Sequence, residues 1–199
     1  MNAFEKKYTT LLDKEIVRCK RCSLHKNGIV KPYYSNKIKY AIIGESPWKV
    51  EVEQNTSFIG STGNLLWNEL SRYQLYREDF LILNSVNCSA ISNHTKKATA
   101  YQVGMCHSWN LLYLKTLMPS KVLILGNLAM GSVNGDFEGI TSKVGYTDKI
   151  KIPFGDHSKY IPVMFCVHPS YALFNEGIGI KQLRAGLKIF SNMEGSVYE

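Results

Sequence analysis

Glu45, Asn84 and His168 are the residues best suited to chemistry, and each follows a short apolar run of the sequence. A carboxylate can orient or deprotonate water, an amide can pair with the edge of a planar polar molecule, and an imidazole can donate a hydrogen bond to developing negative charge. Taken singly, each has an ordinary alternative: a solvated turn carboxylate, a turn asparagine, or a histidine at the surface or already hydrogen-bonded. Their common position favours a site.

The surrounding pattern predicts the elements that would position these residues. Short apolar runs predict strands at 40–43, 80–83, 121–125 and 160–167. Helical spacing predicts helices at 3–18, 64–74 and 100–118, a short one from Gly126, and a last one through Ile180, Leu183, Leu187 and Phe190. This alternation indicates an α/β fold, a three-layer α/β/α sandwich with a central four-stranded parallel sheet. Carboxyl ends of parallel strands share one edge, so the three residues are expected to converge. Residues 131–156 indicate at most a hairpin.

Length and composition set the class of protein. The chain has 199 residues, 45% of them hydrophobic and 20% charged, which is typical of a soluble globular protein. No repeat or linker divides it, so we expect one domain over residues 1–199. No apolar run reaches membrane-spanning length, and residues 1–7 lack the apolar core of a signal peptide. We therefore expect a cytoplasmic monomer without a membrane partner.

The charge favours an anionic partner. The 24 Lys and Arg residues exceed the 16 Asp and Glu residues, for a net charge of +8. Nucleic acid is the commonest anionic partner of a soluble protein, although a lysine-rich composition alone can produce such a charge. Local groups of cations support the prediction: Lys37 with Lys39, Lys96 with Lys97, and Lys181 with Arg184 and Lys188.

The five cysteines indicate metal binding more than disulfides. An odd number argues against a disulfide framework, and Cys19-Lys-Arg-Cys22 is a CxxC pair that Cys88 and Cys106 could complete. By spacing alone, structural zinc comes first, an iron–sulfur cluster second and buried free thiols third. Cys166 lies within an apolar run and is predicted to be a core residue.

Five motifs together resemble the uracil-DNA glycosylase superfamily, nearest its iron–sulfur branch (family 4, with family 5 nearby). In chain order they are Gly44-Glu-Ser-Pro47, Ser57-Phe-Ile-Gly-Ser-Thr-Gly-Asn-Leu-Leu66, Asn84-Ser-Val-Asn-Cys88, Cys106-His-Ser-Trp109 and His168-Pro-Ser-Tyr171. The resemblance covers roughly residues 19 to 190. It implies a monofunctional DNA glycosylase that flips out uracil or a related modified pyrimidine and hydrolyses its N-glycosidic bond, leaving an abasic site.

The resemblance also implies a cofactor. Cys19, Cys22, Cys88 and Cys106 match the family's ligand pattern for a structural 4Fe-4S cluster, with zinc as the alternative. The cluster would tie an N-terminal segment, about residues 1–37, to the rest of the domain and brace a basic DNA-contacting surface.

Site roles follow from the same resemblance. For catalysis, Glu45 would position or deprotonate the attacking water, His168 would donate to O2 of the departing base, and Glu51 is the reserve acid. For base binding, Phe58 would stack on the pyrimidine and Asn84 would pair with its edge, beside Ser46 and Trp48. For DNA binding the candidates are Ser170, Lys96, Lys97, Lys181 and Arg184.

Several of these roles have alternatives. Phe58 could be a core residue and Ser170 a helix or turn cap. The Asn84 amide can form two hydrogen bonds with the edge of uracil. Rotated by 180°, the same amide can form two with cytosine, so Asn84 alone does not identify the base.

Departures from the family pattern surround the base-binding residues. Trp48 occupies a position where the family usually has Gly, and Ser46 replaces the small residue usual next to the acid. Val52 stands where the family often has a second carboxylate, and Ser57 where it commonly has Pro. Residues 89–93 replace a run that is usually rich in Arg and Pro. Two alternatives therefore stay open: a glycosylase directed at hypermodified cytosine in viral DNA, as in antiviral defence, or a non-catalytic damaged-DNA-binding module. A nucleotide-cofactor enzyme is disfavoured, because GxGxxG and Walker motifs are missing.

Overall fold

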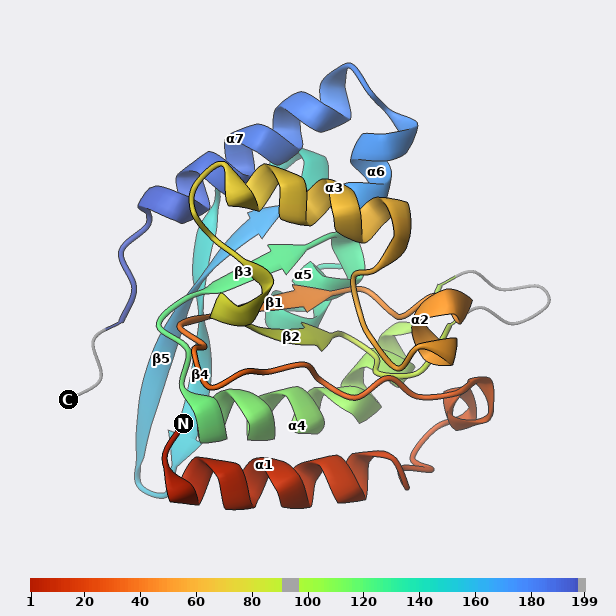
Figure 1. The fold of residues 1–199 in the computed structure, drawn as a ribbon, viewed down its shortest axis with the longest axis vertical. Coiled ribbons are helices and arrows are strands. Elements are labelled where there is room, and N and C mark those ends of the chain that lie inside the picture. The colour runs from red at the N-terminus through yellow and green to blue at the C-terminus, as the bar shows by residue number, and fades with distance from the viewer. Residues whose placement is uncertain (91–96, 197–199) are drawn as a thin grey trace.

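The computed structural model describes residues 1–90 and 97–196, which form a sheet covered by helices on both faces (Figure 1). In that described part the sheet has five strands in the order β2-β1-β3-β5-β4. Four are mutually parallel: β1 (Tyr40–Gly44), β2 (Phe80–Asn84), β3 (Val122–Leu125) and β5 (His157–Cys166). The predicted α/β/α sandwich and its four parallel strands are confirmed.

The sheet also has an edge strand that the sequence did not define. Strand β4 (Thr147–Phe154) pairs antiparallel with β5 to form a hairpin. Its signal is weak because only Ile150 and Ile152 turn inward, while exposed lysines alternate with them. Exposed lysines on an edge strand oppose pairing with another chain. Over the described residues the central sheet is therefore five-stranded and mixed, rather than four-stranded.

Helices cover the two faces of the sheet. On one face lie α4 (Ala100–Leu117) and α5 (Asn127–Asn134), with α1 (Ala3–Ile16) packed outside α4. On the other lie α3 (Gly60–Ser71), α6 (Pro169–Phe174) and α7 (Ile178–Asn192). Short helical segments complete the chain: α2 (Lys49–Glu53), η1 (Ser23–Asn27), η2 (Arg77–Asp79) and η3 (Ile140–Ser142). Among the described residues, no helix is long and apolar enough to span a membrane.

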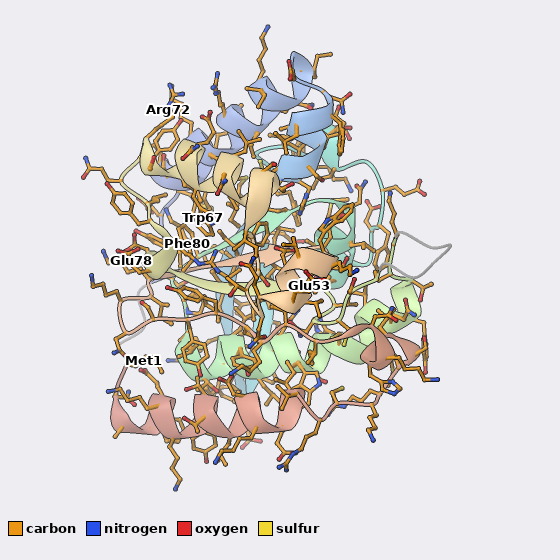
Figure 2. All side chains as sticks on the ribbon, turned by 45° about the vertical axis from the view of Figure 1, so that its right-hand side comes forward. Met1, Glu53, Trp67, Arg72, Glu78 and Phe80 are labelled. Atoms are coloured by element: carbon orange, nitrogen blue, oxygen red, sulfur yellow. The ribbon has the colours of Figure 1, made fainter. Side chains whose placement is uncertain are left out.

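Burial on both faces explains why the strands read as unbroken apolar runs. Ile42 and Ile82 face the core layer under α3 and α7, whereas Ile43 and Leu83 face the layer under α4. Figure 2 labels Trp67 of α3 and Phe80 of β2: Phe80 is fully buried, and the partly buried Trp67 packs against it with ring centroids 6.0 Å apart.

Two helix boundaries have visible causes. Helix α4 begins with a capping box between Thr99 and Gln102 and ends at Met118, just before Pro119. Helix α3 begins at Gly60, one turn earlier than the predicted start at 64. That first turn consists of residues with weak helix propensity, so tertiary packing must impose it. Gly63 permits the packing, because a Cβ atom there would lie 2.0 Å from the carbonyl oxygen of Phe58.

The register of the parallel strands aligns their carboxyl ends. Gly44 at the end of β1 pairs with Asn84 at the end of β2, and Leu125 of β3 pairs with Cys166 of β5. The loops that follow therefore begin at one edge of the sheet. Polar residues far apart in the sequence meet there.

Candidate active site

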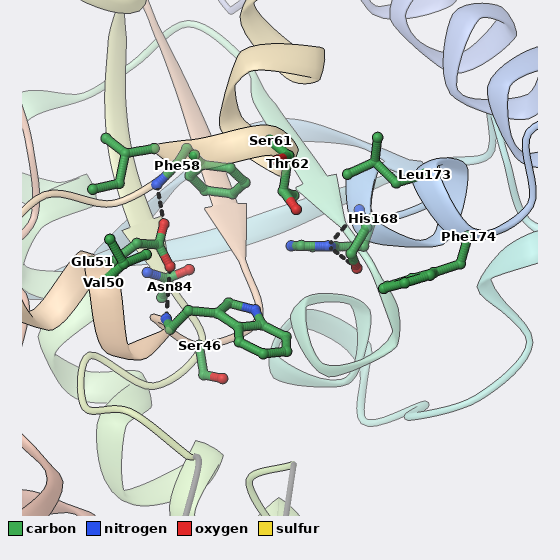
Figure 3. A pocket seen from close by; sticks show the side chains of 14 residues that line it. Ser46, Val50, Glu51, Phe58, Ser61, Thr62, Asn84, His168, Leu173 and Phe174 are labelled. Carbon is green, nitrogen blue, oxygen red and sulfur yellow. Dashed lines mark hydrogen bonds between the residues drawn. The ribbon is translucent and has the colours of Figure 1, made fainter.

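A cavity of about 300 Å³ opens at this edge, and we call it the strand-end cavity. It lies at the lower end of the volume range of small-molecule sites. Figure 3 shows Phe58, Asn84 and His168 facing it from three different segments. The residues that line it and enter the argument below are Trp48, Glu51, Phe58, Asn84, His168 and Ser170.

Asn84 is held at the floor of this cavity, with only 5% of its surface exposed. Its side-chain Nδ2 donates to Ser57 Oγ at 3.0 Å, and its backbone carbonyl accepts from Asn110 Nδ2 at 2.9 Å. Gly44 makes room for it, because a Cβ atom there would lie 2.6 Å from Asn84 Oδ1 and 2.6 Å from the Phe58 ring. The amide is thus fixed before any ligand arrives.

Phe58 adopts a left-handed backbone conformation, with φ of 55°. That conformation costs a non-glycine residue roughly 1–3 kcal/mol, so the surroundings must impose it. The Phe58 N–H donates to Glu51 Oε1, and the Phe58 carbonyl accepts from Trp67 Nε1 at 2.9 Å and Arg77 Nη1 at 3.4 Å. These bonds hold the ring 6.0 Å from that of His168, as ring centroids. Phe58 is therefore a fixed wall of the cavity and not only a core residue.

Glu51 connects the rim of the cavity to Phe58. It is only 8% exposed, and its Oε2 accepts from the Trp48 N–H at 2.7 Å while Oε1 accepts from Phe58. Burial raises the pKa of Glu51, against the opposing effect of these N–H groups and of the Arg77 charge. Its carboxylate oxygens are engaged by backbone donors, which points to positioning. Its predicted catalytic role stays a prediction.

His168 begins α6 and presents its ring to the cavity. Its Nδ1 accepts from the Ser170 backbone N–H at 3.2 Å and lies 2.7 Å from Ser170 Oγ. A ring nitrogen that accepts from an N–H carries no proton, so in the neutral ring the proton sits on Nε2. Burial lowers the pKa of His168, and the charge of Glu45 partly opposes this. The ring is therefore a neutral donor near pH 7.

Glu45 lies beside the strand-end cavity rather than in its lining. Its side chain is half-buried, and Oε1 accepts from the Leu128 N–H at 3.4 Å, in the first turn of α5. A helix N-terminus favours a carboxylate there. Glu45 is close enough to His168 to act on the pKa of that ring. The expected convergence therefore holds in one neighbourhood, with Asn84 and His168 in the lining and Glu45 next to them.

The residues predicted to contact DNA differ in their exposure to solvent and in whether their polar groups are already hydrogen-bonded. Ser170 lines the cavity as the partner of His168, and Lys97 and Lys181 are exposed. Arg184 Nε and Nη2 donate to the Glu69 carboxylate at 3.0 and 2.8 Å, so its charge is already paired. Lys96 lies outside the described residues. These assignments stay predictions.

The two remaining base-binding candidates stand at the rim. Ser46 and Trp48 both line the strand-end cavity, and the Trp48 side chain is 52% exposed. The sequence did not single out Trp67, Arg77 or Phe174. Phe174 lines the cavity and follows the His-Pro-Ser-Tyr motif by three residues, so that proximity was the available signal. Trp67 and Arg77 contribute through their hydrogen bonds to the Phe58 carbonyl. The positions of these residues along the sequence give no indication of those bonds.

A second, smaller cavity is lined by Cys19, Cys22, Cys88 and Cys106, and we call it the cysteine cavity. Burial, with the neighbouring thiols, raises the pKa of Cys88 to about 12. Asn87 donates to Cys106 Sγ from its backbone N–H at 3.4 Å and from Nδ2 at 3.6 Å. Within the described ranges, no three Cys, His, Asp or Glu side chains are already placed to hold a metal ion. Four soft donors around one apolar space nevertheless suit an iron–sulfur cluster or zinc.

Cys166 is separate from that group. It is fully buried in the core under α7, as predicted, and burial raises its pKa to about 12. A thiol in this state is inert and is no candidate ligand.

The structure is thus an α/β/α sandwich with an aromatic-walled cavity at the carboxyl edge of its parallel strands, where α/β proteins commonly bind their ligands. The family model of the uracil DNA glycosylase superfamily matches residues 31–188. The chain belongs to the uracil-DNA glycosylase superfamily, and the resemblance seen in its motifs is confirmed.

Two relatives point to one branch of that superfamily. A type-4 uracil-DNA glycosylase of Archaeoglobus fulgidus is 25% identical over 163 residues, which cover 81% of each chain. A type-4 uracil-DNA glycosylase of Pyrobaculum aerophilum is 32% identical over 113 residues, or 56% of this chain and 57% of the relative. These matches support the iron–sulfur, family-4 branch.

Proposed function

We propose that the protein is a monofunctional DNA N-glycosylase that extrudes uracil or a related pyrimidine from DNA and hydrolyses its N-glycosidic bond. Membership of the superfamily and the names of both relatives support this class of hydrolase. The observation that carries the proposal is the gathering of an aromatic ring, an amide and a neutral imidazole around one cavity. A base inside a duplex is unreachable, so extrusion must precede the reaction.

Recognition of the base rests on Phe58 and Asn84. The Phe58 ring offers a flat face for stacking, held in place by bonds to its own backbone. Asn84 Oδ1 can accept from the ring N3–H of uracil, and the second hydrogen of Nδ2 can donate to O4. Both groups are already positioned, so little ordering entropy is lost on binding.

His168 acts on the departing base. Breaking the N-glycosidic bond leaves negative charge on the base, and the Nε2–H of the neutral ring can donate to that charge at O2. A preorganised donor of this kind is worth about 3 kcal/mol of barrier. The Ser170 N–H maintains the required tautomer by donating to Nδ1.

Glu45 acts on water and on the sugar. Glu45 accepts a hydrogen bond from the Leu128 N–H in the first turn of α5, which holds its carboxyl group beside the cavity. From there a carboxylate can orient or deprotonate the attacking water and offset positive charge on the sugar. The water oxygen then bonds to the sugar carbon that the base leaves, and an abasic site remains.

DNA phosphates would be held by cations and a hydroxyl near the rim. Lys97 and Lys181 are exposed candidates, and the net charge of +8 provides long-range attraction. The Ser170 hydroxyl would have to leave His168 Nδ1 to donate to a phosphate. Arg184 would have to leave Glu69 to take part.

The four cysteines Cys19, Cys22, Cys88 and Cys106 would hold a 4Fe-4S cluster. When bound, the cluster would supply bracing rather than electrons, because it joins the segment of about residues 1–37 to β2's exit and to α4 within one domain. A tetrahedral zinc ion is the alternative for the same donors. Metal analysis and the visible absorption of the purified protein distinguish the two.

The decisive experiment is release of a free base. Oligonucleotides carrying uracil, thymine or a set of modified cytosines are incubated with the protein, and released bases are identified by mass spectrometry. We expect the wild type to release uracil and His168→Ala to release it about 10²- to 10³-fold more slowly. Release of a modified cytosine alone would favour the antiviral alternative. Tight binding of damaged DNA with no base released by a folded protein would favour the non-catalytic module.

A further inference from the structure

Ser57 is a buried serine whose hydroxyl touches the proposed base-reading residue. It is 3% exposed, and its Oγ accepts from Asn84 Nδ2 at 3.0 Å. Within the described part of the chain, this is the one hydrogen bond of the Asn84 side-chain amide. Ser57 stands on the loop before α3, 27 positions before Asn84, so the contact is purely tertiary.

We infer that Ser57 is a specificity-determining residue, which holds the Asn84 amide in the orientation that reads a uracil-type base. The inference rests on the proposed function and deepens it. With Nδ2 engaged by Ser57, the Oδ1 atom and the second N–H remain for a ligand. That pair complements a base with a ring N–H next to a carbonyl. Cytosine has a bare ring nitrogen next to an amino group and would require the amide to turn by half.

Packing alone cannot select between the two orientations. The oxygen and nitrogen ends of an amide are nearly equal in size, so the Phe58 ring accommodates either. Hydrogen-bond partners must decide. A serine hydroxyl can accept from the NH₂ end of the amide or donate to its oxygen end. The surroundings of the end that points away from Ser57 therefore matter as well.

Gly44 supplies the second constraint. A Cβ atom on Gly44 would lie 2.6 Å from Asn84 Oδ1. In the glycine a Cα hydrogen occupies that direction and faces the oxygen. A carbonyl oxygen accepts weakly from Cα–H, whereas an NH₂ group in its place would meet a hydrogen and no acceptor. Gly44 therefore favours the orientation in which Nδ2 points to Ser57, and the bond to the Ser57 hydroxyl stabilises that orientation.

The Ser57 hydroxyl can be removed without touching the neighbouring wall. Phe58 is held through its own N–H by Glu51 and through its carbonyl by Trp67 and Arg77, and none of these bonds involves Ser57 Oγ. Ser57→Ala therefore tests the orientation of Asn84 while the stacking ring stays in place.

The test measures binding, so it does not depend on catalysis. Duplexes carry either 2′-fluoro-deoxyuridine or 2′-fluoro-deoxycytidine, whose glycosidic bonds resist cleavage, and fluorescence anisotropy gives both dissociation constants. We expect the wild type to prefer the uracil analogue and Ser57→Ala to lose about tenfold of that preference, the value of one hydrogen bond. Ser57→Thr, which keeps the hydroxyl, should restore the preference.

The matched control is Ser85→Ala. Ser85 is fully buried at the same edge of the sheet, but its hydroxyl donates to the Gly44 carbonyl at 2.8 Å. Its loss should lower stability and leave the preference unchanged. If Ser57→Ala does not fold, Ser57→Cys, with its weaker hydrogen bonding, takes its place and should show the same loss.

Three results would overturn the inference: no preference in the wild type, the full preference in Ser57→Ala, or a loss in Ser57→Ala that Ser57→Thr does not restore. The proposed function fails separately, if the wild type releases no base from cleavable DNA. A binding preference controlled by Ser57 in a protein that cleaves nothing would uphold the inference alone.

Discussion

The strand-end cavity and the cysteine cavity flank the exit of the same strand, β2, but they are organised in opposite ways. In the first, Asn84, Phe58 and His168 are each fixed by hydrogen bonds to other protein groups. In the second, four thiols gather in an apolar space, and among residues 1–90 and 97–196 the hydrogen bonds to their sulfur atoms are the two from Asn87 to Cys106.

The two arrangements suit two kinds of ligand. A ligand that comes and goes must find its partners in place, since every ordering step would weaken its binding. A resident group can supply the order itself, because folding and metal binding are coupled. The raised pKa of Cys88 fits this view, since its thiolate is unfavourable until a cation neutralises it.

Removing one thiol should give the largest effect. Cys88→Ser is expected to abolish the bound iron and the visible absorption of the cluster, and to lower the free energy of unfolding, since the tie between the N-terminal segment and α4 is lost. Iron analysis and chemical denaturation measure this. Cys166→Ser is the matched control, because Cys166 is also buried but lies outside the cysteine cavity. Retention of full iron content by Cys88→Ser would exclude it as a ligand.

Removing the imidazole should give the next effect, confined to the strand-end cavity. His168→Ala is expected to lower kcat/KM for uracil release by about 10²- to 10³-fold, the typical value of one positioned donor, with unchanged iron content. His157→Ala provides a control, because His157 lies at the start of β5, outside the strand-end cavity, and stacks on Phe154. A similar loss in both variants would indicate a general structural effect.

Replacing Glu51 separates positioning from catalysis. Glu51→Gln keeps the shape of the side chain but can accept from backbone N–H groups through one oxygen only, so the Phe58 loop should loosen. We expect about a tenfold loss of kcat/KM, mostly in KM, since roughly one hydrogen bond is removed. A loss of about 10²-fold or more in kcat, at unchanged KM, would instead identify Glu51 as an acid–base catalyst.

The smallest effect concerns pH and stability. The pKa of His168 lies below its ordinary value of 6.5 in the folded protein, so on acidification the unfolded chain binds a proton first. The free energy of unfolding should therefore fall as the pH drops below 6.5, by at most about 1.4 kcal/mol per pH unit. His168→Gln should lack this component. Urea unfolding of both proteins at about pH 7.5 and about pH 5.5 measures the free energy of unfolding at each pH. An equal change in that free energy between the two pH values, in the wild type and in His168→Gln, would contradict the prediction.

Much of the fold was readable from local patterns. Runs such as Phe80–Leu83 are apolar throughout because both faces of the sheet are covered. A polar residue such as Asn84 marks the point where the apolar run ends. Strand β4 was not readable, since two inward isoleucines among lysines give a weak alternation. The start of α3 was misplaced for a similar reason, because packing against Phe58 makes a helix of residues that rarely form one.

The candidate site divides along the same line. The types of residue that stand at strand ends could be read from the sequence, because strand length and the loop that follows are local properties. Only the tertiary structure decided their partners: Ser57 for Asn84, Glu51 and Trp67 for Phe58, and Glu69 for Arg184. Hydrogen bonds between distant segments depend on ångström-scale placement by the whole packed core, and no spacing along the chain records that placement.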